Sequence, residues 1–141
     1  EAEARRWLGT PYRHQASVRG AGCDCLGLLR GGWRGLYGDE PEPVPPYAAD
    51  RRRDADPGLL LKAAETHLVR VTRPILPGDV LLFRLGRNLP PRHCGIATAT
   101  RGFVHAQERL GVVEVPLSLT WQRRLAGVYA FPGTEDTSWP R

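Results

Sequence analysis

The chain has 141 residues, of which 41% are hydrophobic and 25% charged, ordinary proportions for one globular domain with a buried core. No apolar run approaches the length of a membrane span, and no basic run with interleaved aromatic residues indicates a nucleic-acid groove. The formal net charge is +5, and Lys62 is the only lysine, so arginine supplies nearly all of the positive charge. A basic surface favours an acidic partner such as an anionic cell wall, although solvation is the simpler interpretation for most of these arginines.

Three cysteines, an odd number, argue against a disulfide framework. Cys23 and Cys25 are too close in sequence to bridge without strain, so the set is expected to be reduced thiols or metal ligands. Residues 1–6 form a charged, amphipathic opening, which does not resemble a secretory signal.

The first predicted element is a short helix over residues 1–8 that offers Trp7 and Leu8 to a core. The Gly-Thr-Pro triplet that follows ends this helix. Residues 12–19 are predicted to form a polar loop that leads into a glycine-rich approach to the next helix.

A second helix is predicted from Cys25 to about Tyr37, with Gly38 as its natural end. Its apolar residues recur at spacings of three and four, as on one helical face: Leu26, Leu29, Trp33 and Leu36. Gly31 and Gly32 inside this helix cost about 1 kcal/mol each relative to alanine. They therefore imply tertiary support or the close approach of another element.

Residues 38–58 form a loop rich in proline and charge that includes three consecutive arginines at 51–53. Long loops of this kind are functional or mobile. This one is a candidate lid or docking surface, with a solvated loop as the simpler alternative. A third helix is predicted to begin at Asp56-Pro57, with Asp56 as its cap, and to present an apolar face made of Leu59, Leu60, Ala63, Ala64, His67 and Leu68.

After the third helix the hydrophobic period changes to that of strands. About five strands are predicted, over residues 79–85, 95–99, 102–106, 112–115 and 127–131. Helices followed by antiparallel strands indicate an α+β fold. The whole of residues 1–141 is interpreted as one domain, with residues 132–141 as a loose C-terminal tail.

Cys25 is the candidate nucleophile. It lies at the first turn of the predicted second helix, where the helix dipole and unpaired backbone N–H groups favour thiolate over thiol. The thiolate is the nucleophilic form. Most cysteines simply pack in a core, so the hypothesis depends on the glycine-flanked position and on two histidines downstream.

His93 and His105 are the candidate base and orienting residue. His93 stands just before one predicted strand, and His105 lies in the next strand, twelve residues on. A hairpin centred near Ala99 would place the two side by side, and an even separation keeps them on one face of the sheet. A cysteine nucleophile needs such a base and a third group to orient it.

Five segments of the chain together resemble the NlpC/P60 cysteine peptidases, especially their phage-associated cell-wall branch. The resemblance covers most of the chain, and the Asp-Cys-x-Gly core with the histidine pair is specific only in combination. This chain departs from the usual pattern at Leu26, where the family has serine, and at Cys94, where it has valine. The segments are Leu8-Gly9-Thr10-Pro11-Tyr12, Gly22-Cys23-Asp24-Cys25-Leu26-Gly27-Leu28, Leu76-Pro77-Gly78-Asp79-Val80-Leu81-Leu82-Phe83, His93-Cys94-Gly95-Ile96 and Phe103-Val104-His105-Ala106.

The resemblance implies a papain-like NlpC/P60 fold, with the nucleophile helix packed on the antiparallel sheet. It implies cleavage of peptidoglycan stem peptides, commonly between D-glutamate and meso-diaminopimelate, without a metal or organic cofactor. Its motifs make Cys25 the nucleophile, His93 the base and His105 the third polar residue. Tyr12 matches a tyrosine whose hydroxyl can help the oxyanion site, and Asp24 is interpreted as structural.

The phage branch also implies a setting. The chain would be a tail-tip or baseplate part of a phage or gene-transfer particle, assembled in the bacterial cytoplasm and acting in the periplasm of the target cell during DNA delivery. Its partners would be stem peptides and neighbouring tail proteins.

Three other interpretations stay open. Cys23, Cys25, His93 and Cys94 are legitimate Zn²⁺ ligands, but their Cys-x-Cys and His-Cys spacings are tighter than those of structural zinc sites. The chain could also be a non-catalytic structural or wall-binding tail-tip component. Finally, the same thiolate and base would serve acyl transfer or another amide hydrolysis.

Overall fold

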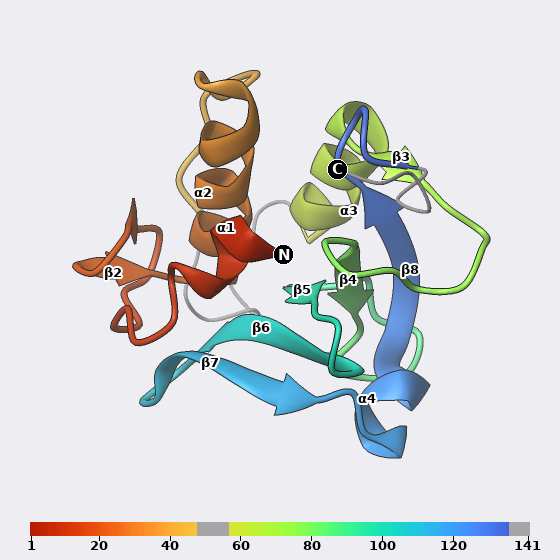
Figure 1. The fold of residues 1–141 in the computed structure, drawn as a ribbon. Helices are drawn as coiled ribbons and strands as arrows, with labels where there is room; N and C mark the ends of the chain where they lie inside the picture. The colour runs from red at the N-terminus through yellow and green to blue at the C-terminus, as the bar shows by residue number, and fades with distance from the viewer. Residues whose placement is uncertain (48–56, 136–141) are drawn as a thin grey trace.

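A six-stranded antiparallel sheet organises the computed structural model, which describes residues 1–47 and 57–135. The strand order is β3-β8-β4-β5-β6-β7, and β1 and β2 form a separate two-stranded sheet (Figure 1). In chain order the elements are α1 (Ala2–Arg5), β1 (Ser17–Val18), β2 (Gly22–Cys23), α2 (Cys25–Tyr37), α3 (Leu59–His67), β3 (Val69–Arg70), β4 (Val80–Phe83), β5 (His93–Ala97), β6 (Gly102–Gln107), β7 (Gly111–Pro116), α4 (Leu119–Arg124) and β8 (Leu125–Ala130).

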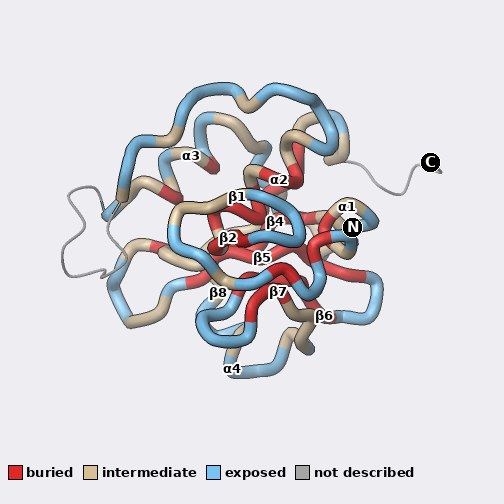
Figure 2. The backbone as a smooth tube through the Cα atoms, turned by 90° about the vertical axis from the view of Figure 1, so that its left-hand side faces the viewer, coloured by how far each residue is buried: buried red, intermediate tan, exposed pale blue. Residues whose placement is uncertain are grey.

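Both faces of the sheet are covered, because side chains alternate along the central strand β4 and each set meets its own cluster. Val80 and Leu82 pack in the larger cluster, which also holds the buried residues of α1, α2 and α3. Leu81 and Phe83 pack in a smaller cluster on the other face, against which Trp121 of α4 also packs. Figure 2 shows the buried residues gathered at the centre of the molecule. The expected α+β fold is thus confirmed; the main sheet has one strand more than predicted, and the sheet of β1 and β2 was not predicted.

Helix α2 has the predicted bounds. Asp24 caps its N-terminus, since its carboxylate accepts a hydrogen bond from the backbone N–H of Gly27 at 2.7 Å. The helix ends at Gly38, whose φ of +88° suits glycine. Its inner face is buried, and includes Leu26, Leu28 and Leu29. This packing fixes the first turn of α2, and with it Cys25, against β5.

The two glycines inside α2 lie where other elements approach closely, as predicted. A Cβ atom on Gly31 would lie 2.0 Å from the ring of Trp7, and one on Gly32 would lie 3.3 Å from Phe131. Gly31 therefore admits the buried Trp7 indole directly against the helix backbone.

Several boundaries differ from those predicted. The first helix is only Ala2–Arg5; Trp7 is buried after it, whereas Leu8 is 41% exposed. The predicted polar loop over residues 12–19 contains β1, which pairs with β2. None of the described helices is both long and apolar enough to cross a bilayer.

The third helix begins later than predicted. Gly58 occupies its N-cap position without a side-chain cap, so Pro57 precedes the helix; Asp56 lies outside the described residues, as do the arginines at 51–53. Four short elements were missed: β1, β2, β3 and α4. The described part of the predicted tail is held, because Arg73 donates to the carbonyl of Glu135 at 2.9 Å and Tyr37 donates to that of Pro132.

The contact between Gly31 and Trp7 predicts a stability difference between two glycines of one helix. Gly31→Ala is expected to lower the free energy of unfolding by about 2 kcal/mol, because overpacking against a buried ring outweighs the gain in helix propensity. Gly35→Ala is the matched control. Its Cβ would meet only the flexible end of Glu3, so the free energy of unfolding should stay unchanged or rise by up to about 1 kcal/mol. Urea denaturation measures both, and equal values would contradict the packing argument.

Candidate active site

Cys25 is the first residue of α2, and its thiol is half-buried, whereas Cys23 and Cys94 are buried. The approach to it is tied down by backbone hydrogen bonds: the N–H of Cys23 donates to Pro11 and that of Arg13 donates to Cys23, both at 3.0 Å. The first N–H groups of a helix have no intrahelical acceptor. The N–H of Gly27 donates to the Asp24 carboxylate. The remaining N–H groups of the first turn beside the thiol are those of Cys25 and Leu26.

The three thiols differ in acidity. The pKa of Cys25 is held well below its usual value by hydrogen bonding with Cys94 and His93 and by the charge of His93, which together outweigh burial and the Asp24 carboxylate. The pKa of Cys94 is raised, by Cys25 and by burial. Burial, with the charges of Asp24 and Cys25, raises the pKa of Cys23 to about 12. Cys25 is therefore the most acidic of the three thiols.

Cys94 packs directly beneath the nucleophile. Its thiol donates to the backbone carbonyl of Cys25 at 3.2 Å, and the Cys25 thiol is 3.9 Å from the carbonyl of Arg92. Cys94 faces α2, whereas His93 packs against Phe83 on the other face, as alternation along β5 requires. Cys94 and the segment just before β5 thus hold the nucleophile, and His93 lies between them at the start of the strand.

His93 and His105 are brought together as predicted. The Nε2 atom of His93 lies 2.8 Å from Nδ1 of His105. The hairpin register pairs Ile96 with Val104, which centres the turn one residue later than expected but keeps both histidines on one face. Gly95 leaves room for this, since a Cβ there would lie 3.3 Å from the Cβ of His105.

His105 is the buried, neutral member of the pair. It is 1% exposed, and burial, followed by the charge of His93, lowers its pKa to about 4. Because His105 is neutral, its Nδ1 can accept a hydrogen bond from Nε2 of His93, which leaves the Nδ1 atom of His93 for Cys25. The Nε2 atom of His105 is buried without a hydrogen-bond partner among the described residues. The pair is arranged to fix the ring of His93.

Trp121 packs against both histidines, a contact that the sequence did not predict. Its ring centroid lies 5.7 Å from that of His93 and 5.4 Å from that of His105, and it also packs on Phe83 and Phe103. These aromatic rings pack against one side of the histidine contact. The available sequence signal was Ser118, which caps α4 by accepting from the N–H of Trp121 at 3.4 Å.

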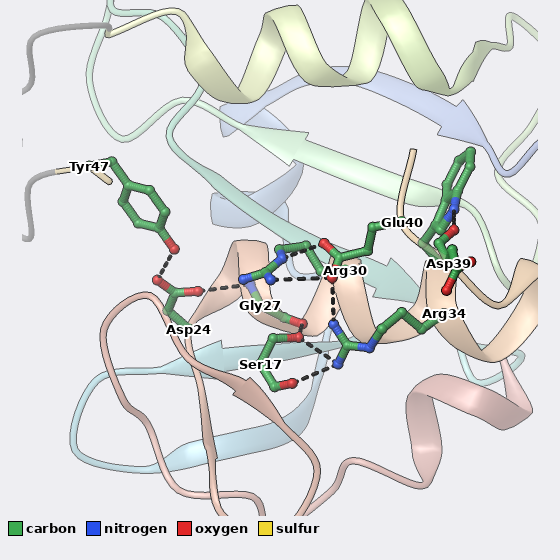
Figure 3. A network of polar contacts seen from close by, with 9 residues as sticks. Ser17, Asp24, Gly27, Arg30, Arg34, Asp39, Glu40 and Tyr47 are labelled. Carbon is green, nitrogen blue, oxygen red and sulfur yellow. Dashed lines mark hydrogen bonds and ion pairs between the residues drawn. The ribbon is translucent and has the colours of Figure 1, made fainter. Parts of the chain in front are cut away.

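The sequence did not predict the contacts made by the described part of the proline-rich loop, residues 39–47. Tyr47 donates to the Asp24 carboxylate, while Glu40 pairs with Arg30 at 2.6 Å and with Arg34 at 3.0 Å (Figure 3). Burial and Asp24 raise the pKa of the Tyr47 hydroxyl, so it stays a donor. The loop is thereby tied along α2.

The nucleophile opens onto a narrow crevice of about 70 Å³. Its described walls come from α2, the loop, the start of α3 and the segment before β5; they include Tyr47, Leu60, Pro91 and Arg92. Asp24 is structural, as interpreted from the sequence, because Gln15 and Gly27 N–H groups and the Tyr47 hydroxyl occupy its carboxylate.

Tyr12 lies close to the nucleophile segment. Its backbone forms a parallel bridge with Cys23, and its half-buried side chain packs against the same core cluster as Cys25. The role of its hydroxyl at an oxyanion site stays a prediction.

The alternative zinc site is not formed. Among residues 1–47 and 57–135, no three His, Cys, Asp or Glu side chains are arranged to hold a metal ion. The four ligands proposed from the sequence, Cys23, Cys25, His93 and Cys94, therefore do not form a tetrahedral site.

The thiol acidities predict selective alkylation. At pH 6.5, iodoacetamide is expected to modify Cys25 before Cys23 and Cys94, because only Cys25 combines thiolate character with exposure. His93→Ala removes one cause of the lowered pKa and should slow the reaction at that pH by about tenfold or more. Peptide mass spectrometry measures both rates. Equal labelling of the three thiols in the native protein would contradict this assignment.

The lowered pKa of His105 predicts a pH-dependent stability. The unfolded chain binds a proton at this residue near pH 6.5, whereas the folded chain does so only near pH 4. The free energy of unfolding should therefore fall as the pH drops from about 6.5 to about 4, by about 3 kcal/mol from this group. His105→Gln should make that decline shallower in urea titrations at each pH. An unchanged slope would show that His105 is not the buried neutral residue.

Comparison with known proteins gives one sequence relative and several structural ones. The chain is 28% identical over 122 residues to the probable endopeptidase NlpC of Escherichia coli, covering 86% of this chain and 69% of that protein. No protein-family profile matches.

Solved structures match over nearly all of the chain, at identities that indicate the fold. The NlpC/p60 domain of the peptidoglycan hydrolase SagA matches with a TM-score of 0.62 at 20% identity, covering 92% of this chain and 94% of that domain. NlpC1 of Trichomonas vaginalis gives 0.65 at 19%, and an NLP/P60 family protein of Staphylococcus aureus gives 0.57 at 22%, each covering 92% of this chain. The chain spans only 42% and 39% of those two. The chain therefore has the NlpC/P60 fold.

Proposed function

We propose that this protein is a cysteine endopeptidase that hydrolyses peptidoglycan stem peptides, with Cys25, His93 and His105 as its catalytic triad. The observation that carries the proposal is the acidic thiol of Cys25 beside a histidine whose other nitrogen is held by a buried, neutral partner. The relatives add the reaction class, because they include a probable endopeptidase and a peptidoglycan hydrolase.

The geometry supports a thiol-protease mechanism. His93 takes the proton of Cys25 on Nδ1, and the thiolate attacks the amide carbonyl carbon. Backbone N–H groups at the start of α2, with the hydroxyl of Tyr12, hold the oxyanion. The leaving amine takes a proton from His93, and water then hydrolyses the thioester. His105 keeps the ring of His93 oriented through Nε2.

The motif resemblance is the support for the bond that is cleaved and for the setting in which the protein acts. We propose the bond between D-glutamate and meso-diaminopimelate as the one cleaved. The phage-associated character of the motifs supports action at the tail tip of a phage or gene-transfer particle, assembled in the producing cell and working in the periplasm of the target cell.

Digestion of peptidoglycan fragments tests the activity. The wild-type protein should release products cut at one stem-peptide bond, identified by mass spectrometry, and Cys25→Ala should release none, because it lacks the nucleophile. Cys23→Ala is the matched control two residues away, and its products should match those of the wild type. Zero turnover by the wild type, with its thiol shown to be reduced, would overturn free-standing catalysis and favour a structural tail component.

A further inference from the structure

A second, larger cleft lies beside the candidate active site. It has a volume of about 640 Å³ and is formed by the segment between β4 and β5, by Leu61 of α3 and by the end of α4. Its lining contains no acidic residue. Four of its lining residues are arginines: Arg84, Arg87, Arg123 and Arg124.

The charge of this cleft is not neutralised within the described part of the chain. Several arginines elsewhere pair with carboxylates at close distances, as Arg5 does with Glu114 at 2.7 Å and Arg73 with Asp79 at 2.7 Å. No described carboxylate forms an ion pair with any of the four cleft arginines, and all four are exposed. Their guanidinium groups are therefore available to an anion from outside.

Two physical links join the cleft to the candidate catalytic residues. Pro91 lines both the cleft and the crevice at Cys25, and it is two residues from His93. On the other side, the guanidinium of Arg124 lies 5.6 Å from the ring centroid of Trp121, whose ring packs on His93. A peptide placed at the thiol could therefore extend into the arginine cleft.

We propose that this arginine cleft binds the carboxylates of the stem-peptide substrate, and so sets a preference for free-acid over amidated stem peptides. The inference rests on the proposed function, because a γ-linked D-glutamate keeps a free α-carboxylate and diaminopimelate carries further carboxyl groups next to the cleaved bond. Arginine recognises carboxylates through paired N–H donors, and amidation removes the negative charge without changing the shape.

The test compares two stem peptides that differ only in having free or amidated carboxyl groups. The double variant Arg87→Gln/Arg123→Gln leaves the Arg124–Trp121 stack intact. Two lost exposed ion pairs should raise KM for the free-acid peptide by about tenfold, with kcat within twofold of the wild type. KM for the amidated peptide should not change. Added salt should reduce the wild-type preference, because these charges are exposed.

Arg19→Gln is the control for the loss of an exposed arginine outside the cleft, because Arg19 is exposed in the turn between β1 and β2 and forms no described ion pair. It should leave both KM values unchanged. An equal effect of the double variant on both peptides, or an equal effect of Arg19→Gln, would overturn the proposal. Equal competition by inorganic polyphosphate and by the free-acid peptide would instead indicate a general polyanion site and contradict the stated preference.

Binding to the Cys25→Ala protein, measured by calorimetry, separates this proposal from the proposed activity. Tighter binding of the free-acid peptide, lost in the double arginine variant, supports the cleft even if the wild type shows no turnover. Equal affinity for the two peptides overturns the cleft even if the wild type cleaves both.

Discussion

The packing of α2 on β5 is the contact on which the site depends. It places the first turn of the helix, with Cys25, over Cys94, whose thiol reaches the carbonyl of Cys25 at 3.2 Å. The same strand supplies His93 as its first residue. Helix dipole, thiol and imidazole therefore meet because one apolar interface is formed, and the nucleophile needs no separate device to hold it. Gly31 and Gly32 let Trp7 and Phe131 pack closely against the middle of that helix.

The histidine pair illustrates how burial and chemistry are coupled. His105 lies within an aromatic enclosure of Phe103 and Trp121, and the low polarity there keeps its imidazole neutral. A neutral His105 ring can accept a hydrogen bond from the Nε2–H of His93, whereas a charged ring has no free acceptor and would repel a second positive charge. Burial of His105 destabilises the fold at mildly acidic pH, and it gives the neighbouring histidine one orientation.

Charge is distributed unevenly over the molecule. Arg30 and Arg34 of α2 both pair with Glu40 (Figure 3). This pairing ties the proline-rich loop along the helix, near the contact of Tyr47 with Asp24. Arginines around the cleft beside His93 have no such partners in the described part of the chain. Part of the excess positive charge seen in the composition is thus located next to the candidate catalytic residues.

The sequence by itself determined the helix that begins at Cys25, the antiparallel order of the later strands, and the pairing of His93 with His105. These depend on local period, on a capping aspartate and on the parity of strand positions, which are short-range properties. Only the tertiary structure decided that α4 brings Trp121 over the histidines, that Tyr47 reaches Asp24, and that Arg87 and Arg123 line one cleft. Those contacts join residues from 16 to 36 positions apart, through short elements whose local patterns are weak. Their partners are chosen by packing and charge, so no local rule places them.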